Sequence, residues 1–232
     1  MILTAHQPTY LPWAGLFHKI WLADLFIFLD TVQYLPKEWM NRNYIRSKNE
    51  PICLSIPVLD KDFLKIKTNE IMINNNQNWQ RKHLKSIYLN YKNEKYFDFY
   101  FNKLQTIYEK KYHYLSIFNY EILIMLLKVL EIKTEIVKSS DYNFKFKKSD
   151  LVLEMCKEFN ASTFIFGEQG RDYAKEDEFK KNNVRIFYQN YLVPQQFNLK
   201  SKKNLSVIDL LFRYGDKTRE IILSNQNNFD LK

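Results

Sequence analysis

The chain has 232 residues and a formal net charge of +9, and 46% of its residues are hydrophobic. This length suits one large domain, or one domain with a substantial insertion, and the apolar fraction is enough for a real core. The longest unbroken apolar run, 122–127, is far too short to span a membrane, and the isolated Cys53 and Cys156, each in an apolar stretch, predict buried free thiols and no disulfide scaffold.

The first thirty residues predict a strand, a helix and a second strand. Met1 to Ala5 has the pattern of a short buried strand, and residues 14–23 place apolar side chains on one helical face. Residues 25–29 form an apolar run typical of a strand buried on both faces, with Asp30 at its end. We therefore expect two parallel strands joined by a right-handed helical crossover.

The whole chain predicts an α/β fold with a mainly parallel sheet, flanking helices and a helical insertion in the middle. The insertion is expected at 79–132, and its last helix, apolar almost all round, should be buried. Segments 1–78 and 133–232 would then be the two α/β halves of one domain. Further strands are expected at 43–46, 52–58, 134–138, "STFIF" and "VRIFYQNY", and further helices at 150–159 capped by Ser149, at 174–182, and at 205–214 stopped by Gly215.

The opening stretch "TAHQPTYLPWAGLFHKI" places polar residues directly after the first predicted strand. Ligands of an open parallel sheet bind beyond the carboxyl ends of its strands. His6 and Gln7 follow the first strand and Asp30 and Gln33 follow the second, so all four are expected at the same edge. His6 could act as general acid or base with Asp30 as its partner. A buried imidazole bonded to backbone, and a carboxylate that caps a turn, explain the same two residues.

The loop between the first strand and the helix is stiff and aromatic. Pro8 and Pro12 restrict the backbone angle φ. Tyr10 and Trp13 could form a wall for a planar or sugar ligand, or they could pack in the core. Lys19 lies about one helical turn beyond the loop, where it could reach a phosphate or carboxylate, or simply lie on a solvated helix face.

A second group of candidates is in "EWMNRNYI", which carries Trp39, Arg42 and Asn43. The planar guanidinium of Arg42 is suited to a bidentate grip on a phosphate or carboxylate. Because Arg42 follows the second strand closely, we expect it near the edge that carries His6. Pairing with a surface carboxylate is the alternative.

A third group follows the strand "STFIF". In "GEQGRDY", Gly167 and Gly170 would let backbone amides approach an anion at a helix start, although the motif matches no phosphate-binding fingerprint and also fits a plain turn. In "VPQQF", the glutamines could bond sugar hydroxyls or cap a turn. The candidates from these two stretches are Gly167, Glu168, Arg171, Tyr173 and Gln196.

The segment 80–113 combines eight Lys or Arg with three Asp or Glu and nine Tyr or Phe. Basic residues interleaved with aromatics are typical of surfaces that bind single-stranded nucleic acid. A helical hairpin with an aromatic buried face and a Lys-rich wet face gives the same composition. A charged tRNA, if it were the donor of an acyl group, would dock here.

Several kinds of site are absent from the sequence. The four histidines and two cysteines have no metal-ligand spacing, so no metal site is expected. There is no G-x-S-x-G elbow and no close carboxylate pair of the kind glycoside hydrolases use.

Three blocks of the sequence resemble the WbqC-like family: "HQPTYLPWAGLFHKI", "ADLFIFLDTVQY" and "NRNYI". The later "GEQGRDYAKEDEF" and "LSVIDLLFRYG" are similar to that family's downstream blocks in order and spacing, so the resemblance covers essentially the whole chain. One departure is Phe166-Gly167, where the family usually has Ser-Gly.

The resemblance implies a biosynthetic enzyme for a bacterial O-antigen or capsule, and the lack of a secretory signal and of a long apolar run predicts a cytoplasmic location. The expected activity is a transferase that attaches a small acyl or aminoacyl group, such as glycine, to a nucleotide- or lipid-linked amino sugar. An activated acyl or aminoacyl donor could serve as co-reactant, and no cofactor is assigned. Two alternatives stay open: a nucleotidyltransferase- or ligase-like enzyme that uses a nucleoside triphosphate, and a non-enzymatic nucleic-acid-binding protein.

Overall fold

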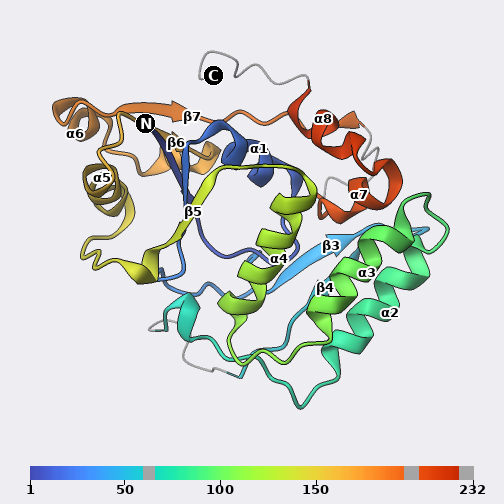
Figure 1. The fold of residues 1–232 in the computed structure, drawn as a ribbon. Helices are drawn as coiled ribbons and strands as arrows, with labels where there is room; N and C mark the ends of the chain where they lie inside the picture. The colour runs from blue at the N-terminus through green and yellow to red at the C-terminus, as the bar shows by residue number, and fades with distance from the viewer. Residues whose placement is uncertain (60–65, 196–203, 225–232) are drawn as a thin grey trace.

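The computed structural model describes residues 1–59, 66–195 and 204–224. It has an α/β fold built on a five-stranded sheet of order β5-β2-β1-β6-β7, in which every neighbouring pair is parallel (Figure 1). The strands are β1 (Ile2–His6), β2 (Leu25–Phe28), β5 (Glu135–Lys138), β6 (Thr163–Phe166) and β7 (Arg185–Tyr188). The predicted fold class is confirmed.

Helices cover both faces of this sheet because each strand alternates the side on which its side chains point. On one face, Leu25 and Ile27 pack against α5 (Lys148–Glu158) and α6 (Glu176–Lys181). On the other face, Phe26 and Phe28 belong to a larger core. That core includes residues of α1 (Ala14–Leu22), α2 (Trp79–Tyr91), α3 (Phe97–Tyr108), α4 (Leu115–Val129), α7 (Ile208–Tyr214) and α8 (Lys217–Leu223).

The predicted β1-α1-β2 unit is present, with β1 and β2 parallel in the register Leu3↔Leu25 to His6↔Phe28. From β2 the chain later returns to β5 on the same side of the sheet, whereas β6 and β7 lie on the other side of β1. The strand order therefore reverses between β1 and β6. This reversal is the place where open α/β sheets bind ligands.

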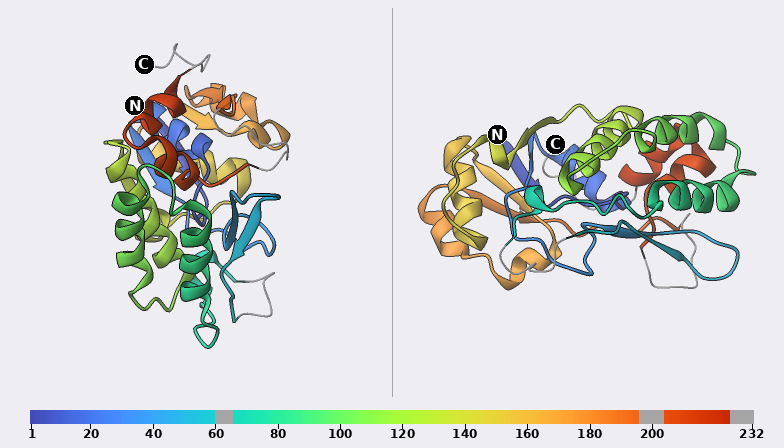
Figure 2. Two further views of the ribbon diagram at one scale, coloured as in Figure 1. Left: turned by 90° about the vertical axis from the view of Figure 1, so that its right-hand side faces the viewer. Right: turned by 90° about the horizontal axis from the view of Figure 1, so that it is seen from below.

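The strands β3 (Arg42–Ile45) and β4 (Ile52–Ser55) form a separate antiparallel hairpin. They pair with each other and not with the five-stranded sheet (Figure 2). The three helices α2, α3 and α4 occupy the predicted insertion, and they share one hydrophobic core with α1 and β2. The division at 79–132 into insertion and flanking halves stays a prediction.

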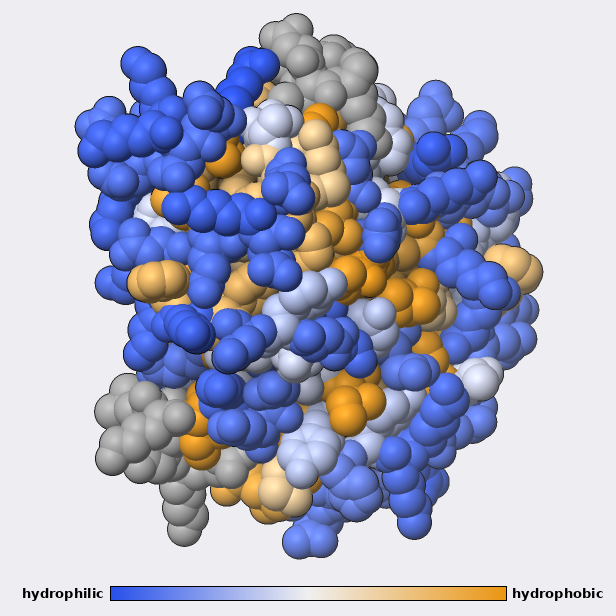
Figure 3. Space-filling model, turned by 60° about the vertical axis from the view of Figure 1, so that its left-hand side comes forward, coloured by the Kyte–Doolittle hydropathy of each residue, from blue (hydrophilic) through white to orange (hydrophobic). Residues whose placement is uncertain are grey.

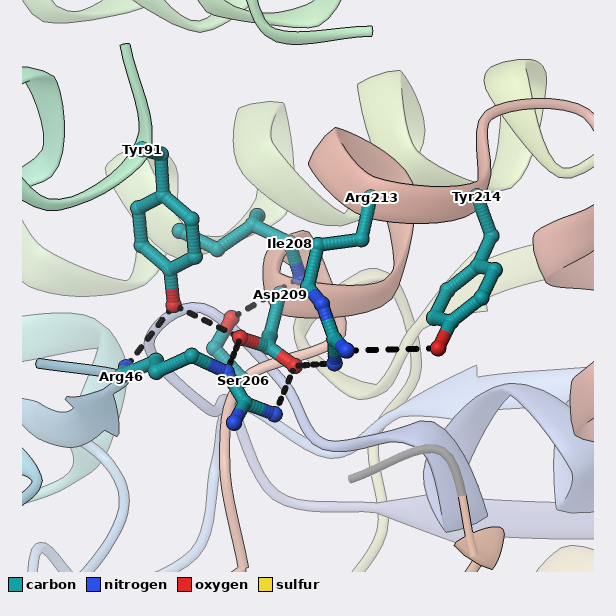
Figure 4. Close-up of polar contacts among 7 residues, drawn as sticks. All are labelled: Arg46, Tyr91, Ser206, Ile208, Asp209, Arg213 and Tyr214. Carbon is teal, nitrogen blue, oxygen red and sulfur yellow. Dashed lines mark hydrogen bonds and ion pairs between the residues drawn. The ribbon is translucent and has the colours of Figure 1, made fainter. Parts of the chain in front are cut away.

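A buried carboxylate ties the hairpin to α2 and α7 (Figure 4). The carboxylate of Asp209, in α7, accepts from Nε and Nη2 of Arg46 at 2.7 and 2.9 Å. It also accepts from Arg213 at 3.4 Å and from the Tyr91 hydroxyl at 3.2 Å. The Asp209 hydrogen bond is the main cause that raises the pKa of Arg46 above its ordinary value. Three segments far apart in the sequence are thus held by one side chain.

Three local expectations were wrong. Cys53 is exposed, because it lies on the outer face of the hairpin, while Cys156 is buried as predicted. Ser149 does not cap α5, since Lys147 is the N-cap residue and the Ser149 hydroxyl accepts from Lys175 N at 2.9 Å. Helix α4 is not buried all round, because Ile117 and Ile124 remain 48% and 38% exposed.

The surface of the molecule is mainly polar, with an apolar band visible on the face shown in Figure 3. Within the described ranges, no helix combines the length and the apolar character that a membrane crossing demands. The same part of the chain holds no group of three or more His, Cys, Asp or Glu that could bind a metal ion.

Candidate functional site

His6 ends β1 with a half-buried imidazole. Its Nδ1 lies 2.8 Å from the Gln7 carbonyl and 3.3 Å from the Thr9 hydroxyl. A carbonyl can only accept, so Nδ1 carries the proton and the Nε2 lone pair is free to accept one. Burial, and secondly the Lys19 charge, lower the pKa of His6 to about 3. Without a ligand the ring is therefore uncharged at neutral pH.

Lys19 is buried, with 4% of its surface exposed, and its ammonium donates to the Ala5 carbonyl at 3.0 Å. Among the described residues it has no carboxylate partner, so two of its three N–H donors are left without a protein acceptor. Burial lowers the pKa of Lys19 to about 8. A buried cation without a counter-ion is costly, and an anionic ligand would offset that cost.

The Lys19 ammonium lies at the switch point of the sheet. The His6 carbonyl accepts from Leu29 N on the β2 side, so the Ala5 carbonyl, one residue earlier, points toward β6. The β1–β6 register ends at Thr4↔Ile165, whereas the β1–β2 register continues to His6↔Phe28. The Lys19 ammonium therefore binds the Ala5 carbonyl just beyond the point where the pairing of β1 with β6 ends. We call the ends of these strands, His6, Gln7 and Gly167, together with Lys19, the β1–β6 edge.

The loop that carries His6 into α1 is held from three sides. The buried Asn43 amide donates to the carbonyls of Tyr10 and Leu11 at 3.2 and 2.7 Å. Tyr10 N donates to the Trp39 carbonyl at 3.0 Å, and Val207 N donates to the Pro12 carbonyl at 2.9 Å. The Asn43 side chain thus fixes the backbone of the loop that follows His6.

Tyr10 does not form a wall of the site, because its side chain is 0% exposed. Its hydroxyl bonds His83 Nδ1 at 2.8 Å and the Tyr108 hydroxyl. Desolvation raises the pKa of Tyr10 well above its ordinary value. A phenol needs a partner when it is buried, and here the partners come from α2 and α3. Tyr10 fastens the loop to the helical insertion.

Asp30 and Arg42 do not join His6. The Asp30 carboxylate accepts from the Ser139 hydroxyl, Ser140 N and the Ser140 hydroxyl at 2.9, 3.0 and 2.9 Å. It thereby caps the turn after β5, the alternative that the sequence left open. Arg42 is in the β3–β4 hairpin, and its guanidinium donates to the Lys37 carbonyl. Within the described ranges no hydrogen bond or ion pair links either residue to His6.

Trp13 covers the first turn of α1. A Cβ placed on Gly15 would lie 2.3 Å from Cη2 and 2.5 Å from Cζ3 of the indole, so only glycine fits here. The indole also meets the Tyr191 ring edge-on, with centroids 5.5 Å apart. Trp13 is partly exposed, so it remains a candidate for ligand contact.

Gly15→Ala should destabilise the fold by about 1–3 kcal/mol, because the added methyl group overpacks the indole of Trp13. Gly167→Ala is the matched control, since a Cβ there meets no described atom within 4 Å. It should leave the unfolding free energy within about 1 kcal/mol of wild type. Urea denaturation measures both variants. Equal stability of the two would contradict the packing described for Trp13.

The "GEQGRDY" segment forms a short 3-10 turn, Glu168–Asp172, after β6. Gly167 is open to approach, whereas Gly170 is needed for packing, because its Cβ would lie 2.6 Å from the Phe166 side chain. Arg171 is exposed and stacks on the Tyr188 ring at 4.2 Å. Glu168 and Tyr173 are exposed beside it.

The remaining sequence candidates are dispersed. Gln33 is exposed, and its backbone forms an isolated antiparallel β-bridge with Lys67. Trp39 is 41% exposed, with its ring against Tyr44. Gln196 lies outside the described residues. The side chain of Gln7 is partly exposed next to His6, and its carbonyl fixes the tautomer of that ring.

Two positioning residues were missed by the sequence analysis. Thr9 contacts His6 and also donates to the Gln7 carbonyl at 3.1 Å. Gln189 directly follows β7, and its amide donates to the Gly15 carbonyl and to His18 Nδ1 at 2.9 and 2.8 Å. The rule that placed His6 at a strand end would have found Gln189 as well.

The buried histidines make the fold sensitive to acid. Burial is the main cause that lowers the pKa of His6 to about 3 and those of His18 and His83 to about 4. The unfolded chain therefore binds more protons than the folded chain as the pH falls below about 6.5, and the unfolding free energy falls with it.

Between pH 6.5 and 4, His83→Gln should lower the number of protons taken up on unfolding by up to about one, so the unfolding free energy should fall less steeply with pH. The measurement is the free energy of urea unfolding across that range. His113→Gln, which replaces an exposed histidine, is the matched control variant. An unchanged slope in the His83 variant would show that this ring charges freely in the folded state.

Comparison with known proteins supports one assignment. The chain is 29% identical to the uncharacterized protein Rv1507c of Mycobacterium tuberculosis (strain ATCC 25618 / H37Rv) over 213 residues, which cover 90% of this chain and 92% of that protein. No solved structure matches this chain. The sequence profile of the WbqC-like protein family matches residues 7–221, a span that includes Gln7, Lys19 and the segments that hold His6 in place, and this chain belongs to that family.

Proposed function

We propose that the protein is a transferase of bacterial surface-glycan biosynthesis, which attaches a small acyl or aminoacyl group, such as glycine, to a phosphorylated or nucleotide-linked amino sugar. The observation that carries the proposal is the buried Lys19 ammonium at the parting of β1 and β6, whose one hydrogen-bond acceptor among the described residues is a backbone carbonyl. The phosphate of the sugar substrate is the counter-ion that this position lacks.

His6 acts as the general base in this proposal. As the sugar amine attacks the acyl carbon of the donor, an amide bond forms, the leaving group departs, and Nε2 of His6 takes the proton that the amine loses. The hydrogen bond from Nδ1 to the Gln7 carbonyl supports this role, because it leaves Nε2 as the acceptor.

The substrate itself would make His6 a better base. The Lys19 charge contributes to the low pKa of His6, and a phosphate bound at Lys19 would offset that charge. The pKa of His6 should therefore rise toward neutrality when the sugar phosphate binds. Gln7, Trp13 and Gly167 are our candidates for contacts with the rest of the sugar.

A second candidate is a nucleotidyltransferase- or ligase-like enzyme, which is favoured by the order of the strands. Numbered among themselves, the parallel strands run 3-2-1-4-5, the order of doubly wound nucleotide-binding sheets without the sixth strand. This likeness concerns the fold, and the chemistry must be argued from the site.

Incubation with a uridine-diphosphate amino sugar and an acyl or aminoacyl donor, followed by mass spectrometry of the sugar, tests the proposal. We expect acylated sugar with the wild type and strongly reduced product with Lys19→Met. Pyrophosphate release from a nucleoside triphosphate would favour the second candidate. Equal binding of the nucleotide sugar by wild type and Lys19→Met would reject the role of the β1–β6 edge.

A further inference from the structure

A second surface lies on the helical insertion, away from the strand ends. The helices α2 and α3 run side by side (Figure 1), and a groove of about 530 Å³ lies between them. We call it the α2–α3 groove. Its lining includes Arg81, Lys85, Tyr88, Phe101, Tyr108 and Glu109.

The basic residues of the groove form one stripe. Arg81, Lys85 and Tyr88 lie three or four residues apart on α2, so they share one helix face, which Lys92 continues. Arg81 and Lys85 are exposed, and neither side chain has an ion pair or hydrogen bond with any described residue. These two charges are therefore available to a ligand.

The acid in the groove is already engaged. The Glu109 carboxylate accepts from the Gln105 amide at 2.6 Å, which ties it to its own helix. Arg81 and Lys85 outnumber Glu109, the one carboxylate among the described lining residues, so the groove as a whole favours a negatively charged occupant.

Between the charges lies an aromatic floor. The Tyr88 ring is 47% exposed, and it meets the Phe101 ring with centroids 6.0 Å apart. The Lys92 ammonium lies over the Tyr88 ring at 5.8 Å. Where aromatic rings lie beside cations, the rings stack on nucleic-acid bases and the cations attract the phosphates. Such surfaces bind single strands with little dependence on the base sequence.

We propose that the α2–α3 groove binds a single-stranded segment of RNA, with bases stacked on Tyr88 and phosphates at Arg81 and Lys85. An acidic peptide would use the cations but not the aromatic floor. The proposal stands independently of the transfer reaction at the β1–β6 edge. If that reaction draws its aminoacyl group from RNA, this groove is where the donor docks.

The groove reaches the loop of the candidate site through one side chain. Tyr108 lines the groove, and its hydroxyl bonds the Tyr10 hydroxyl. Tyr10 belongs to the loop that holds His6. An RNA strand bound in the α2–α3 groove would therefore lie against α2 and α3, the two helices to which Tyr10 fastens that loop.

The test is fluorescence anisotropy of the full chain with a labelled single-stranded RNA of about 12 nucleotides, titrated at several salt concentrations. Arg81→Gln with Lys85→Gln should weaken binding and reduce the slope of log K against log salt by about 1.4. Tyr88→Ala should weaken binding about fivefold or more. The control is Lys157→Gln with Lys180→Gln, at exposed lysines of α5 and α6, which should bind like wild type.

Each other outcome overturns the proposal. Equal losses in the control pair would mean attraction by net charge alone. A Tyr88→Ala variant that binds like wild type would mean a polyanion surface without base stacking. Absence of wild-type binding at about 50 mM salt would mean that the groove takes no RNA. Circular dichroism of each variant checks that α2 and α3 are folded, and ligand binding by Lys19→Met separately tests the β1–β6 edge.

Discussion

Replacing His6 by Ala should lower turnover by about 10²–10⁴-fold, the usual effect of removing a general base. The imidazole is held by the Gln7 carbonyl and the Thr9 hydroxyl, so its Nε2 has a fixed direction. Added imidazole should restore part of the lost rate, because the cavity left by the ring can admit it. The measurement is kcat in the transfer assay.

Two controls separate a base from a structural histidine. His113→Ala removes an exposed ring and should leave kcat unchanged. Thr9→Val should lower kcat less than His6→Ala does, since it removes one orienting contact and leaves the base. An unchanged kcat in a folded His6→Ala variant would remove His6 from the mechanism and leave the edge as a binding site only.

Replacing Lys19 by Met should stabilise the protein while abolishing its use of an anionic substrate. Burial lowers the pKa of Lys19 from 10.5 to about 8, which corresponds to about 3 kcal/mol of lost stability at neutral pH. Met fills a similar volume without a charge. The unfolding free energy at pH 7 should therefore rise, by up to that amount, and the affinity for the sugar phosphate should fall at least about 30-fold.

The sign of the Lys19 effect fixes a pH window. Between about pH 8 and 10.5 the unfolded chain binds more protons at this residue than the folded chain, so wild-type stability rises with pH there. The advantage of the Met variant should shrink through this window and vanish above it. Lys128→Met, which replaces an exposed lysine of α4, is the matched control variant. A destabilised Lys19→Met variant that still binds the sugar phosphate would assign Lys19 a purely structural part.

The sequence by itself determined the β1-α1-β2 unit. The apolar runs and the single helical face between them are local patterns, and a parallel pair follows from the length of the crossover. It also placed His6 and Lys19 in one neighbourhood, because a strand end and the following helix cannot lie far apart. The blocks that resemble the WbqC-like family could also be recognised from sequence, because each is a short local pattern, and the family match covers residues 7–221.

The tertiary structure alone decided which polar groups meet. Asp30 was expected beside His6, yet its carboxylate caps the turn after β5, a segment about a hundred residues later in the chain. Arg42 was expected at the same edge, but β3 pairs with β4 in a hairpin outside the main sheet. No local pattern reveals which distant donor will satisfy a carboxylate.

The position of Lys19 shows the same division. Its place on α1 follows from the sequence. Whether it lies at a ligand-binding edge depends on β6, which pairs with β1 but follows the whole helical insertion in the chain. Strand order arises from long-range pairing and core packing, which periodicity does not encode. The sequence therefore named the residues of the β1–β6 edge, and only the assembled sheet showed that a buried cation, with no carboxylate partner among the described residues, lies where two strands part.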